Sequence, residues 1–404
     1  TLRNSSAASD VYKRQYQSLT LEQKIGQLFM PMVFSQGDQN HYQKATSAIE
    51  KYHLGGIIFS KGTIAEQVRL TNEFQNKSSV PLLIAMDAEW GMAMRISDVS
   101  PFPFQMTLGA IQNDSLLYQL GQSMANRQRR VGVHLNFSPV VDVNTNSKNP
   151  VIGLRSFGSD PKLVSQKGGM IIRGMQDGGL MTSIKHFPGH GNTSTDSHHT
   201  LPLVNHDINH LKRIELYPFN TLIDEGVFSV MVGHLEVPTL EQTKGLPSSL
   251  SSSIIHDLLV KEFGFDGLVV TDALNMKGVS DHSGKQSSSL RSFLAGADLL
   301  LIPDDLPIAF EDIRNAFMSG VIAEKRLAHS VKKILKAKFD AKLHKSKLVL
   351  GVYLFQVIEN SYAAKLNHHL AEASLTVIQN KNQILPIQQF ENTNIAYVKI
   401  GEAT

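Results

Sequence analysis

Residues 180–199 read LMTSIKHFPGHGNTSTDSHH, a short apolar run that leads into a loop crowded with polar side chains. The first five residues are typical of a buried strand. Two glycines and a proline then interrupt regular structure, which predicts a loop directly after that strand. Four histidines, Lys185 and Asp196 lie in or beside the loop. Titratable groups crowded at the end of a buried strand indicate a functional site, and a merely solvated, histidine-rich loop is the plainer alternative.

Similar apolar runs recur along the chain, and helical patterns separate most of them. The runs are residues 28–34, 54–59, 81–87, 133–138, 180–184, 228–234, 267–272 and 297–303. The helical patterns include residues 19–26 with Thr20 as N-cap, 42–52, 64–75, 116–130, 163–176, 211–225 and 254–263. Most runs are continuously apolar rather than alternating, as parallel strands buried on both faces should be.

About eight such βα units in roughly 300 residues predict an α/β fold, a (β/α)₈ barrel of TIM type. An open doubly wound sheet is the main alternative. No G-x-G-x-x-G motif follows the first strand, which weakens a dinucleotide-binding version of that sheet. Polar residues at the ends of successive runs favour the barrel, because a barrel gathers these ends around one pocket. They are Asp87, Asn136, Lys185, His186, His234 and Asp272.

Composition excludes several classes of protein. The chain has 404 residues, 42% hydrophobic and 19% charged, which is typical of a globular protein. A net charge of +3 is too small to indicate nucleic acid or an anionic surface as a partner. With no cysteine, the chain has no disulfide, thiolate metal site or cysteine nucleophile. No apolar run reaches the roughly 20 residues that span a bilayer.

We divide the chain into three parts. Residues 1–15 are polar, without clear periodicity or an initial Met, and we expect them to be non-native or disordered. Residues 16–340 form the barrel. Residues 341–404 begin with a basic linker, continue with a helix over 363–373 and two short strands within 375–387, and predict the start of a truncated second α/β domain. An export signal could have been lost with an altered N-terminus, so the compartment stays open.

Several strand-end residues have both a structural and a functional interpretation. Asp272 could cap the helix that follows it, but its place at a barrel strand's C-terminal end favours a role in the pocket. Asp87 and Arg95 could form a buried ion pair that holds a loop, or could hydrogen-bond a polar ligand. Arg155, in a glycine-bounded loop, could reach the same ligand.

The histidines also admit a metal site. His186, His190, Asp196, His198 and His199 are plausible ligand types. Metal-dependent barrel hydrolases also draw histidine from an early strand, however, and residues 29–32 contain none. We therefore expect no metal ion and no cofactor, and keep a metal-dependent amidohydrolase as an alternative from another class.

At this point the motifs resemble those of a known family. Lys-His-Phe-Pro-Gly-His-Gly-Asn-Thr at 185–193, Asp-Ser-His at 196–198 and Val-Val-Thr-Asp-Ala at 269–273 resemble glycoside hydrolase family 3, within it the β-N-acetylhexosaminidase branch. The resemblance covers roughly residues 16–340 as the catalytic barrel and 341–404 as the start of the second domain. The long loop motif is specific, whereas Thr-Asp-Ala alone would be weak.

The resemblance implies a role for each matching residue. Asp272 would be the nucleophile that forms a covalent glycosyl-enzyme intermediate. His198 would be the general acid/base, with Asp196 as its partner. The residues that would bind the terminal sugar are Asp87, Arg95, Arg155, Lys185 and His186.

These roles predict a retaining exo-β-N-acetylglucosaminidase whose partner is a carbohydrate, either a glycan containing N-acetylglucosamine or a muropeptide. Such activity would serve peptidoglycan turnover or recycling, or chitooligosaccharide breakdown. The retaining mechanism needs an attacking carboxylate and a proton donor, and a His–Asp dyad can supply the proton. A β-glucosidase or β-xylosidase of the same family and a non-catalytic sugar-binding protein are the remaining alternatives.

Overall fold

A computed structural model of the chain describes residues 6–195, 201–280, 286–345, 348–351 and 353–387. The chain separates into two compact units, Thr1–Ser374 and Leu375–Thr404. Every strand of the described residues belongs to the first unit.

The first unit is built on parallel strands that follow one another in chain order. Seven strands form one sheet in the order β2-β3-β4-β5-β6-β7-β8, and β1 pairs with β9 in a two-stranded ladder. All of these pairings are parallel. The strands are β1 (Phe29–Met30), β2 (Met32–Phe34), β3 (Gly56–Ser60), β4 (Leu83–Met86), β5 (Leu135–Asn136), β6 (Met181–Phe187), β7 (Ser229–Val232), β8 (Leu268–Thr271) and β9 (Leu300–Leu301).

Two connections close the strands into a ring. The backbone amide of Thr271 donates to the carbonyl of Leu299 at 3.0 Å, which brings β8 beside β9. On the other side, β1 and β2 are halves of one strand separated by Pro31, which has no amide hydrogen to donate. The β1 half pairs with β9 and the β2 half with β3. The predicted (β/α)₈ barrel is confirmed, with the β1–β2 strand as its first member.

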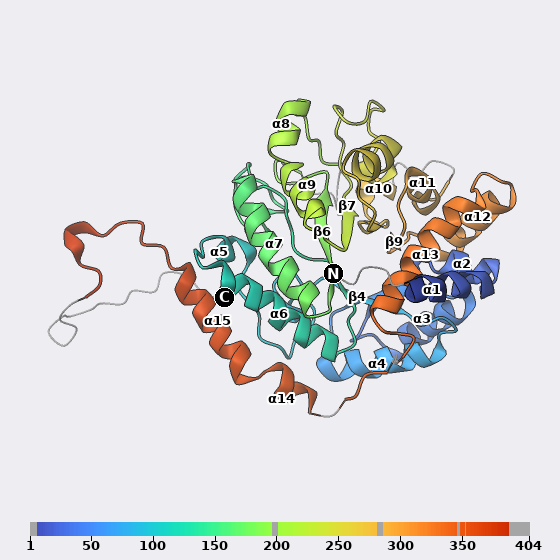
Figure 1. The fold of residues 1–404 in the computed structure, drawn as a ribbon, viewed down its shortest axis with the longest axis horizontal. Helices are drawn as coiled ribbons and strands as arrows, with labels where there is room; N and C mark the ends of the chain where they lie inside the picture. Colours follow the sequence, from blue (N-terminus) through green and yellow to red (C-terminus); the bar gives the residue numbers. More distant parts are fainter. Residues whose placement is uncertain (1–5, 196–200, 281–285, 346–347, 352, 388–404) are drawn as a thin grey trace. The chain divides into compact units, whose positions relative to one another are not determined.

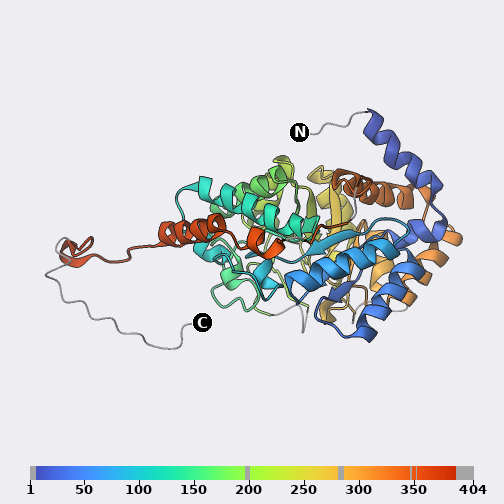
Figure 2. The same ribbon diagram turned by 90° about the horizontal axis from the view of Figure 1, so that it is seen from below.

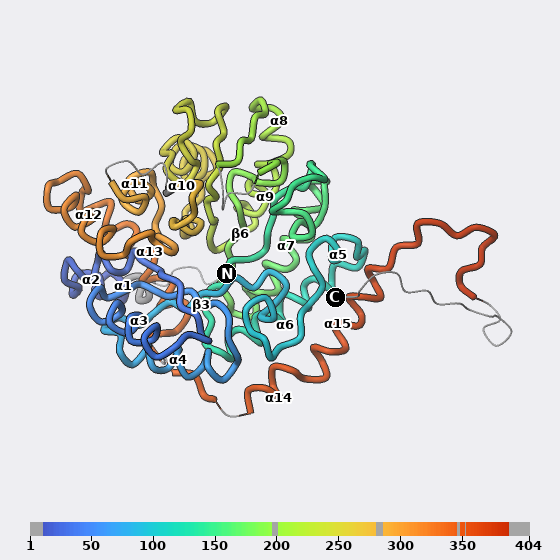
Figure 3. Tube along the Cα trace, turned by 180° about the vertical axis from the view of Figure 1, so that it is seen from behind, coloured from blue at the N-terminus to red at the C-terminus, as the bar shows by residue number. Residues whose placement is uncertain are grey.

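Helices surround the ring, as Figure 1 shows from one side and Figure 3 from behind. The longer ones are α3 (Gln39–Tyr52), α4 (Ile64–Lys77), α6 (Asp114–Arg130), α7 (Pro161–Asp177), α9 (Tyr217–Asp224), η4 (Ser253–Glu262), α11 (Ser288–Ala295), α12 (Leu306–Met318) and α13 (Glu324–Asp340). The shorter ones include α2 (Leu21–Gly26), α5 (Gln105–Gly109), α8 (Ile208–Arg213), η3 (Ser248–Leu250) and α10 (Lys277–Ser280). Every residue of β3, β4, β6, β7 and β8 is buried, so helices cover the ring as the continuous apolar runs require.

Side-chain caps explain where several helices begin. Thr20 accepts from the backbone amide of Gln23, whose side chain accepts from the amide of Thr20 in return, and this confirms the predicted N-cap of α2. At the start of α3, Asp38 accepts from the backbone amide of His41, and at the start of α4, Thr63 accepts from that of Glu66. Each cap of this kind stabilises its helix by about 1 kcal/mol.

Helices α6 and α7 lie side by side because two glycines let their backbones approach closely (Figure 1). A Cβ atom on Gly121 would lie 2.3 Å from the carbonyl oxygen of Ile171. One on Gly174 would lie 2.1 Å from that of Tyr118. Neither position can carry a side chain without separating the helices, which would move the loops that follow β4 and β5.

Some elements differ from the sequence-based prediction. The helix predicted over 211–225 is two helices, α8 and α9, and Pro218 stands in the first turn of the second, where it fits without breaking a helix. Residues 375–387 contain no strand, only a short helical turn at Lys381–Gln383, so the two predicted strands are wrong. The side chains of this segment are almost all exposed, Leu375, Val377 and Ile378 included, so its apolar residues pack against no core within the described part of the chain.

The two ends of the first unit are helical. Helix α1 (Ser6–Ser18) packs against α13 (Figure 2), and its Tyr16 side chain is buried and donates to Glu324. Most of the segment expected to lack order is therefore a helix, while residues 1–5 lie outside the described part. After the linker, α14 (Leu354–Ile358) precedes α15 (Ser361–Ser374), which confirms the predicted helix over 363–373. The predicted domain boundaries stay a prediction.

A membrane-spanning helix would have to be both long and strongly apolar. Across the described ranges, no helix meets both conditions.

Candidate active site

Six of the residues predicted to form the site are described, and the structure brings them to one end of the barrel, where the strands finish. They are Asp87, Arg95, Arg155, Lys185, His186 and Asp272. The two others, Asp196 and His198, lie outside the described residues.

Lys185 is a buried cation held between two carboxylates. Its ammonium group lies 2.6 Å from Oδ1 of Asp87 and 2.8 Å from Oε1 of Glu89. Burial lowers the pKa of Lys185, but these two carboxylates raise it more, and the net shift is upward. The side chain is only 3% exposed, whereas that of Asp87 is 23% exposed. Lys185 therefore positions Asp87, which keeps a face open to solvent.

Glu89 is the centre of a second charge pair. The guanidinium of Arg155 donates to both of its carboxylate oxygens at 2.8 Å, the fork geometry that Arg offers and Lys cannot. Burial raises the pKa of Glu89, but Lys185 and Arg155 lower it well below its usual range. Arg155 itself is 24% exposed, so the buried carboxylate orients a cation that still reaches the pocket.

Arg95 contacts Asp87 from the opposite side. Its Nε donates to the backbone carbonyl of Asp87 at 3.1 Å, and its terminal nitrogen lies 3.3 Å from Oδ2. The short helix η1 (Met92–Met94) precedes it and turns the chain back toward the end of β4. With Lys185 on Oδ1 and Arg95 on Oδ2, Asp87 is fixed in one orientation.

The partners of His186 define the orientation of its ring. Nε2 lies 3.3 Å from a terminal guanidinium nitrogen of Arg155. Nδ1 lies 2.7 Å from Oδ2 of Asp142, a carboxylate oxygen that can only accept, so Nδ1 carries a proton. The ring is held at both nitrogens and stands near the end of β6, beside the register irregularity between Ile184 and Phe187.

Asp142 connects the end of β6 to the loop after it. Besides His186, it accepts from the backbone amide of His190 at 2.6 Å. Its carboxylate is fully buried. Burial raises the pKa of Asp142, yet His186 and the amide of His190 lower it to a value below its usual range. An ionised carboxylate therefore holds the start of the histidine-rich loop.

The same loop is anchored up to its last described residues. The side-chain amide of Asn149 donates to the carbonyl of His190 at 2.8 Å, and that of Asn146 donates to the carbonyl of Thr193 at 3.1 Å. Gly191 packs directly on the backbone, because a Cβ there would lie 1.9 Å from the carbonyl oxygen of Val143. Burial lowers the pKa of His190 to about 4, so this imidazole is neutral at pH 7.

Asp272 follows β8 and is partly exposed. The amide of Ala273 donates to its Oδ1 at 2.8 Å. Burial raises the pKa of Asp272, but His234, His186, that amide and Lys185 together lower it below its usual range. An ionised carboxylate on a partly exposed residue, within the electrostatic reach of Lys185, is therefore present at neutral pH.

His234, at the end of β7, supports the residue after Asp272. Its Nε2 lies 2.9 Å from the carbonyl oxygen of Ala273, which can only accept, so Nε2 carries a proton. Its Nδ1 lies 2.7 Å from the hydroxyl of Ser249. These contacts connect β7 and η3 to the segment that carries Asp272. They explain why a polar residue, His234, follows the end of β7.

Sequence reasoning missed two carboxylates of this site, Glu89 and Asp142. Glu89 is two residues beyond Asp87, and this spacing in the loop after β4 was the available signal. Asp142 lies six positions after β5 and gives no local signal, because its partners are 44 and 48 residues away. Both are buried, and both act by fixing cations or imidazoles that face the pocket.

The arrangement combines side chains that can donate to and accept from hydroxyl groups with a further ionised carboxylate, that of Asp272. Asp87, Arg95 and Arg155 are each about a quarter exposed, which suits hydrogen bonding to a polyhydroxylated ligand. Asp272 offers an ionised carboxylate at the same end. A hollow lined by Phe228, Gly267 and Lys333 lies at the other end, where β7 and β8 begin, and barrel enzymes do not use that face for catalysis.

A barrel that gathers hydrogen-bonding side chains and an ionised carboxylate at its strand ends is the pattern of a glycoside hydrolase, and comparison with known proteins gives the family. The model of the glycosyl hydrolase family 3 N-terminal domain matches residues 20–337. The chain belongs to glycoside hydrolase family 3.

Individual relatives agree with this assignment. The β-hexosaminidase A of Pseudoalteromonas piscicida is 31% identical over 382 residues, covering 87% of this chain and 63% of that protein. A β-N-acetylglucosaminidase/β-glucosidase of Cellulomonas fimi is 27% identical over 374 residues, covering 91% and 66%. The chain thus spans less than two thirds of the length of both. The structure of a family 3 β-N-acetylglucosaminidase from Paenibacillus sp. str. FPU-7 matches with a TM-score of 0.81 and 35% identity, over 90% of this chain and 70% of that one.

Proposed function

We propose that this barrel is the catalytic part of a retaining exo-β-N-acetylglucosaminidase. It would hydrolyse terminal non-reducing N-acetyl-β-D-hexosamine residues. The observation that supports this most is the place of Asp272, a partly exposed residue directly after β8, at the same end of the barrel as the Asp87–Lys185 pair. Nearby charges and the amide of Ala273 hold the pKa of Asp272 below its usual range. A nucleophile must be ionised at the working pH, and an acid must not be.

The proposed reaction has two steps. The carboxylate of Asp272 attacks the anomeric carbon, the glycosidic C–O bond breaks, and the leaving oxygen takes a proton from His198. Water then attacks the anomeric carbon of the glycosyl-aspartate and gives a proton to His198, which frees Asp272 and the sugar with its original configuration. Asp196 would orient the imidazole of His198 and stabilise its protonated form.

The remaining polar residues would hold the sugar. Asp87 accepts from neighbouring hydroxyls, and Arg95 and Arg155 donate to ring substituents. Carboxylates hold both Lys185 and His186 in place. Lys185 contacts Asp87 and Glu89, and His186 contacts Asp142. Such rigid partners lower the entropy that substrate binding would otherwise cost.

The choice of an N-acetylated sugar follows the relatives, whose names include β-hexosaminidase and β-N-acetylglucosaminidase. Peptidoglycan fragments or chitooligosaccharides would supply such sugars. The double name of the Cellulomonas fimi relative keeps a β-glucosidase as the second candidate. Membership of a glycoside hydrolase family removes the support for a metal-dependent amidohydrolase.

Hydrolysis of 4-nitrophenyl N-acetyl-β-glucosaminide beside the plain β-glucoside tests the proposal. Native protein should turn over the N-acetylated substrate, and Asp272→Ala should lose at least about 1,000-fold in kcat/KM. Asp266→Ala is the matched control, because Asp266 is an exposed aspartate before the start of the same strand. Preference for the plain glucoside would favour the second candidate, and full activity in Asp272→Ala would overturn the mechanism.

A further inference from the structure

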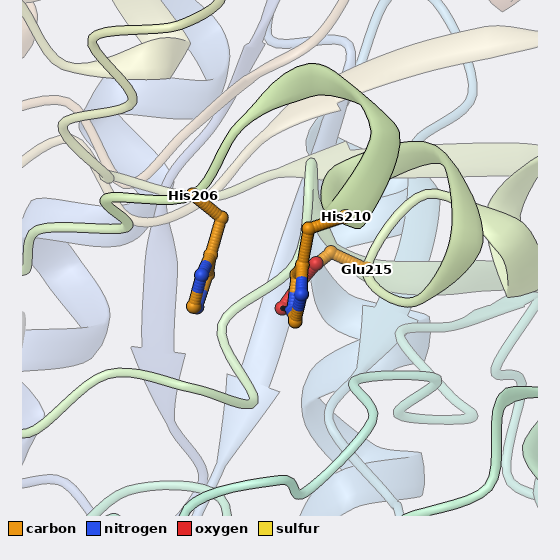
Figure 4. Close-up of side chains that lie close together, drawn as sticks. All are labelled: His206, His210 and Glu215. Carbon is orange, nitrogen blue, oxygen red and sulfur yellow. Dashed lines mark ion pairs between the residues drawn. The ribbon is translucent and has the colours of Figure 1, made fainter.

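Three metal-ligand side chains meet outside the candidate active site, between β6 and α9. His206 precedes α8, His210 lies within it, and Glu215 lies between α8 and α9 (Figure 4). One ligand atom from each lies within 4.8 Å of the other two. The two imidazole rings are stacked, with centroids 3.9 Å apart and planes 17° from parallel. Figure 4 shows the carboxylate of Glu215 behind the ring of His210.

Glu215 is the unusual member of this cluster. Its side chain is 1% exposed, and neither carboxylate oxygen has a hydrogen-bond partner among the residues that the structure describes. Nε2 of His210 lies 3.5 Å from Oε1, too far for a good hydrogen bond, and it too lacks a hydrogen-bond partner in the described part of the chain. Gly189 packs closely against the side chain of Glu215. A Cβ atom added to Gly189 would lie 2.7 Å from Cβ of Glu215. A buried carboxylate without a hydrogen bond is costly unless a cation compensates it.

The neighbouring acidic residue, Asp207, already accepts hydrogen bonds from backbone amides. Asp207 accepts from the amides of Asn209 and His210 and so caps α8. It is therefore not needed as a ligand. His206 has a partner of its own, because its Nε2 lies 2.9 Å from the side-chain oxygen of Asn192. In the tautomer that donates from Nε2, Nδ1 carries the lone pair that a metal needs, and such a second contact is typical of metal-binding histidines.

We propose that His206, His210 and Glu215 bind a divalent cation of the zinc class. Two imidazoles and one carboxylate match the ligand preference of Zn²⁺, and both histidines are partly exposed, which leaves a fourth position for water. Zn–N distances of about 2.0–2.1 Å place two ligand nitrogens about 3.3 Å apart. The stacked rings must therefore rotate, since each lone pair lies in its ring plane, and partial exposure allows that rotation.

The site would act on structure rather than on the reaction. Asn192, the partner of His206, belongs to the histidine-rich loop and also donates to Thr145 at 2.7 Å. An ion at the cluster would fix the segment 206–215 against the base of that loop. The inference does not depend on the proposed glycosidase activity, and binding is measurable without any substrate.

The test is a zinc titration of the chelator-treated, dialysed full chain in competition with a chromophoric chelator. The native chain should bind one equivalent of zinc more than His206→Gln or His210→Gln. Zinc bound at any other site of the chain is common to all three proteins and cancels in this difference. His368→Gln is the matched control, because His368 forms an exposed i,i+4 pair with Glu372 on α15. The control should bind as much as the native chain, and Mg²⁺ should not compete. Equal binding by the native chain and both site variants would overturn the proposal.

Glu215→Gln gives an independent readout. It removes a buried charge that has no hydrogen-bond partner, so its melting temperature without zinc should not fall below that of the native chain. Zinc should raise the melting temperature of the native chain and leave that of Glu215→Gln unchanged. An equal rise in both proteins, or no rise in the native chain, would contradict the site. Should this variant fold poorly, the partly exposed His210 decides the question through His210→Gln.

Discussion

The ammonium group of Lys185 lies 2.6 Å from Oδ1 of Asp87, although the two residues come from strands that are not neighbours. Lys185 is in β6 and Asp87 follows β4, with β5 between them in the sheet. The contact spans the end of β5 and joins the loop after β4 to β6 at the candidate sugar site. Lys185 also contacts the buried Glu89, so one ammonium group compensates two carboxylates, and we expect its removal to affect stability as well as the proposed sugar binding.

Lys185→Met should therefore destabilise the protein strongly. It keeps the aliphatic stem but leaves Glu89 with only Arg155 as a cation, and breaking a buried pair in this way costs about 3 kcal/mol. Urea unfolding measures the loss. Lys212→Met removes an exposed pair with Glu262 and should cost about 0.5 kcal/mol or less. If the two variants lost the same free energy of unfolding, the buried ion pairs of Lys185 would contribute no more to stability than an exposed pair.

Arg155→Lys should weaken substrate binding more than catalysis. Lysine cannot form the two parallel hydrogen bonds to Glu89, so the cation would lose its fixed position at the pocket. We expect KM to rise about tenfold, which corresponds to about 1.4 kcal/mol, with a smaller change in kcat. Arg173→Lys, at an exposed pair with Glu225, is the control. An unchanged KM would remove Arg155 from the sugar site.

Asp142 should give a measurable acid dependence of stability. Its pKa is depressed in the folded protein, so its contribution is present above the pKa of the unfolded chain and is lost as pH falls through the folded value. Asp142→Asn should be less stable than the native chain at pH 7, and the gap should shrink below about pH 4. Guanidinium unfolding across this range measures the gap. A gap that is constant with pH would contradict an ionised Asp142.

His198→Ala tests the proposed acid through the leaving group. A general acid is needed most when the leaving oxygen is a poor one, and such catalysis contributes about 100-fold or more. We expect a loss of that size on an alkyl or sugar aglycone and a much smaller one on 4-nitrophenolate. His199→Ala changes the adjacent histidine and serves as control. Equal losses on both aglycones would reject His198 as the proton donor.

The sequence predicts those parts of the fold and site that depend on local patterns. Parallel strands that are buried on both faces have continuous apolar sequences. The strands and the barrel could therefore be predicted from such runs. Asp87, Lys185 and Asp272 could be found because barrel strand ends converge. The break between α8 and α9 carried a visible signal in Pro218, but the periodic pattern around it hid the break.

What could not be predicted depends on contacts between distant segments. Asp142 is placed by the loop that returns to β6, and nothing near it in the sequence indicates that partner. The spacing of His206 and His210 was visible, but the burial of Glu215 involves close packing against Gly189, which lies 26 positions earlier in the chain. Burial without a partner is a property of the folded chain alone.

The most direct test of the account is to trap the intermediate on Asp272. A 5-fluoro N-acetyl-β-glucosaminyl fluoride has a good leaving group and slow hydrolysis of the second step, so the glycosyl-enzyme should accumulate. Mass spectrometry of the digested protein should then find the added sugar on the peptide that carries Asp272, and no such adduct in Asp272→Ala. A sugar attached to another carboxylate, or turnover in Asp272→Ala without an adduct, would contradict the assignment of Asp272 as the nucleophile.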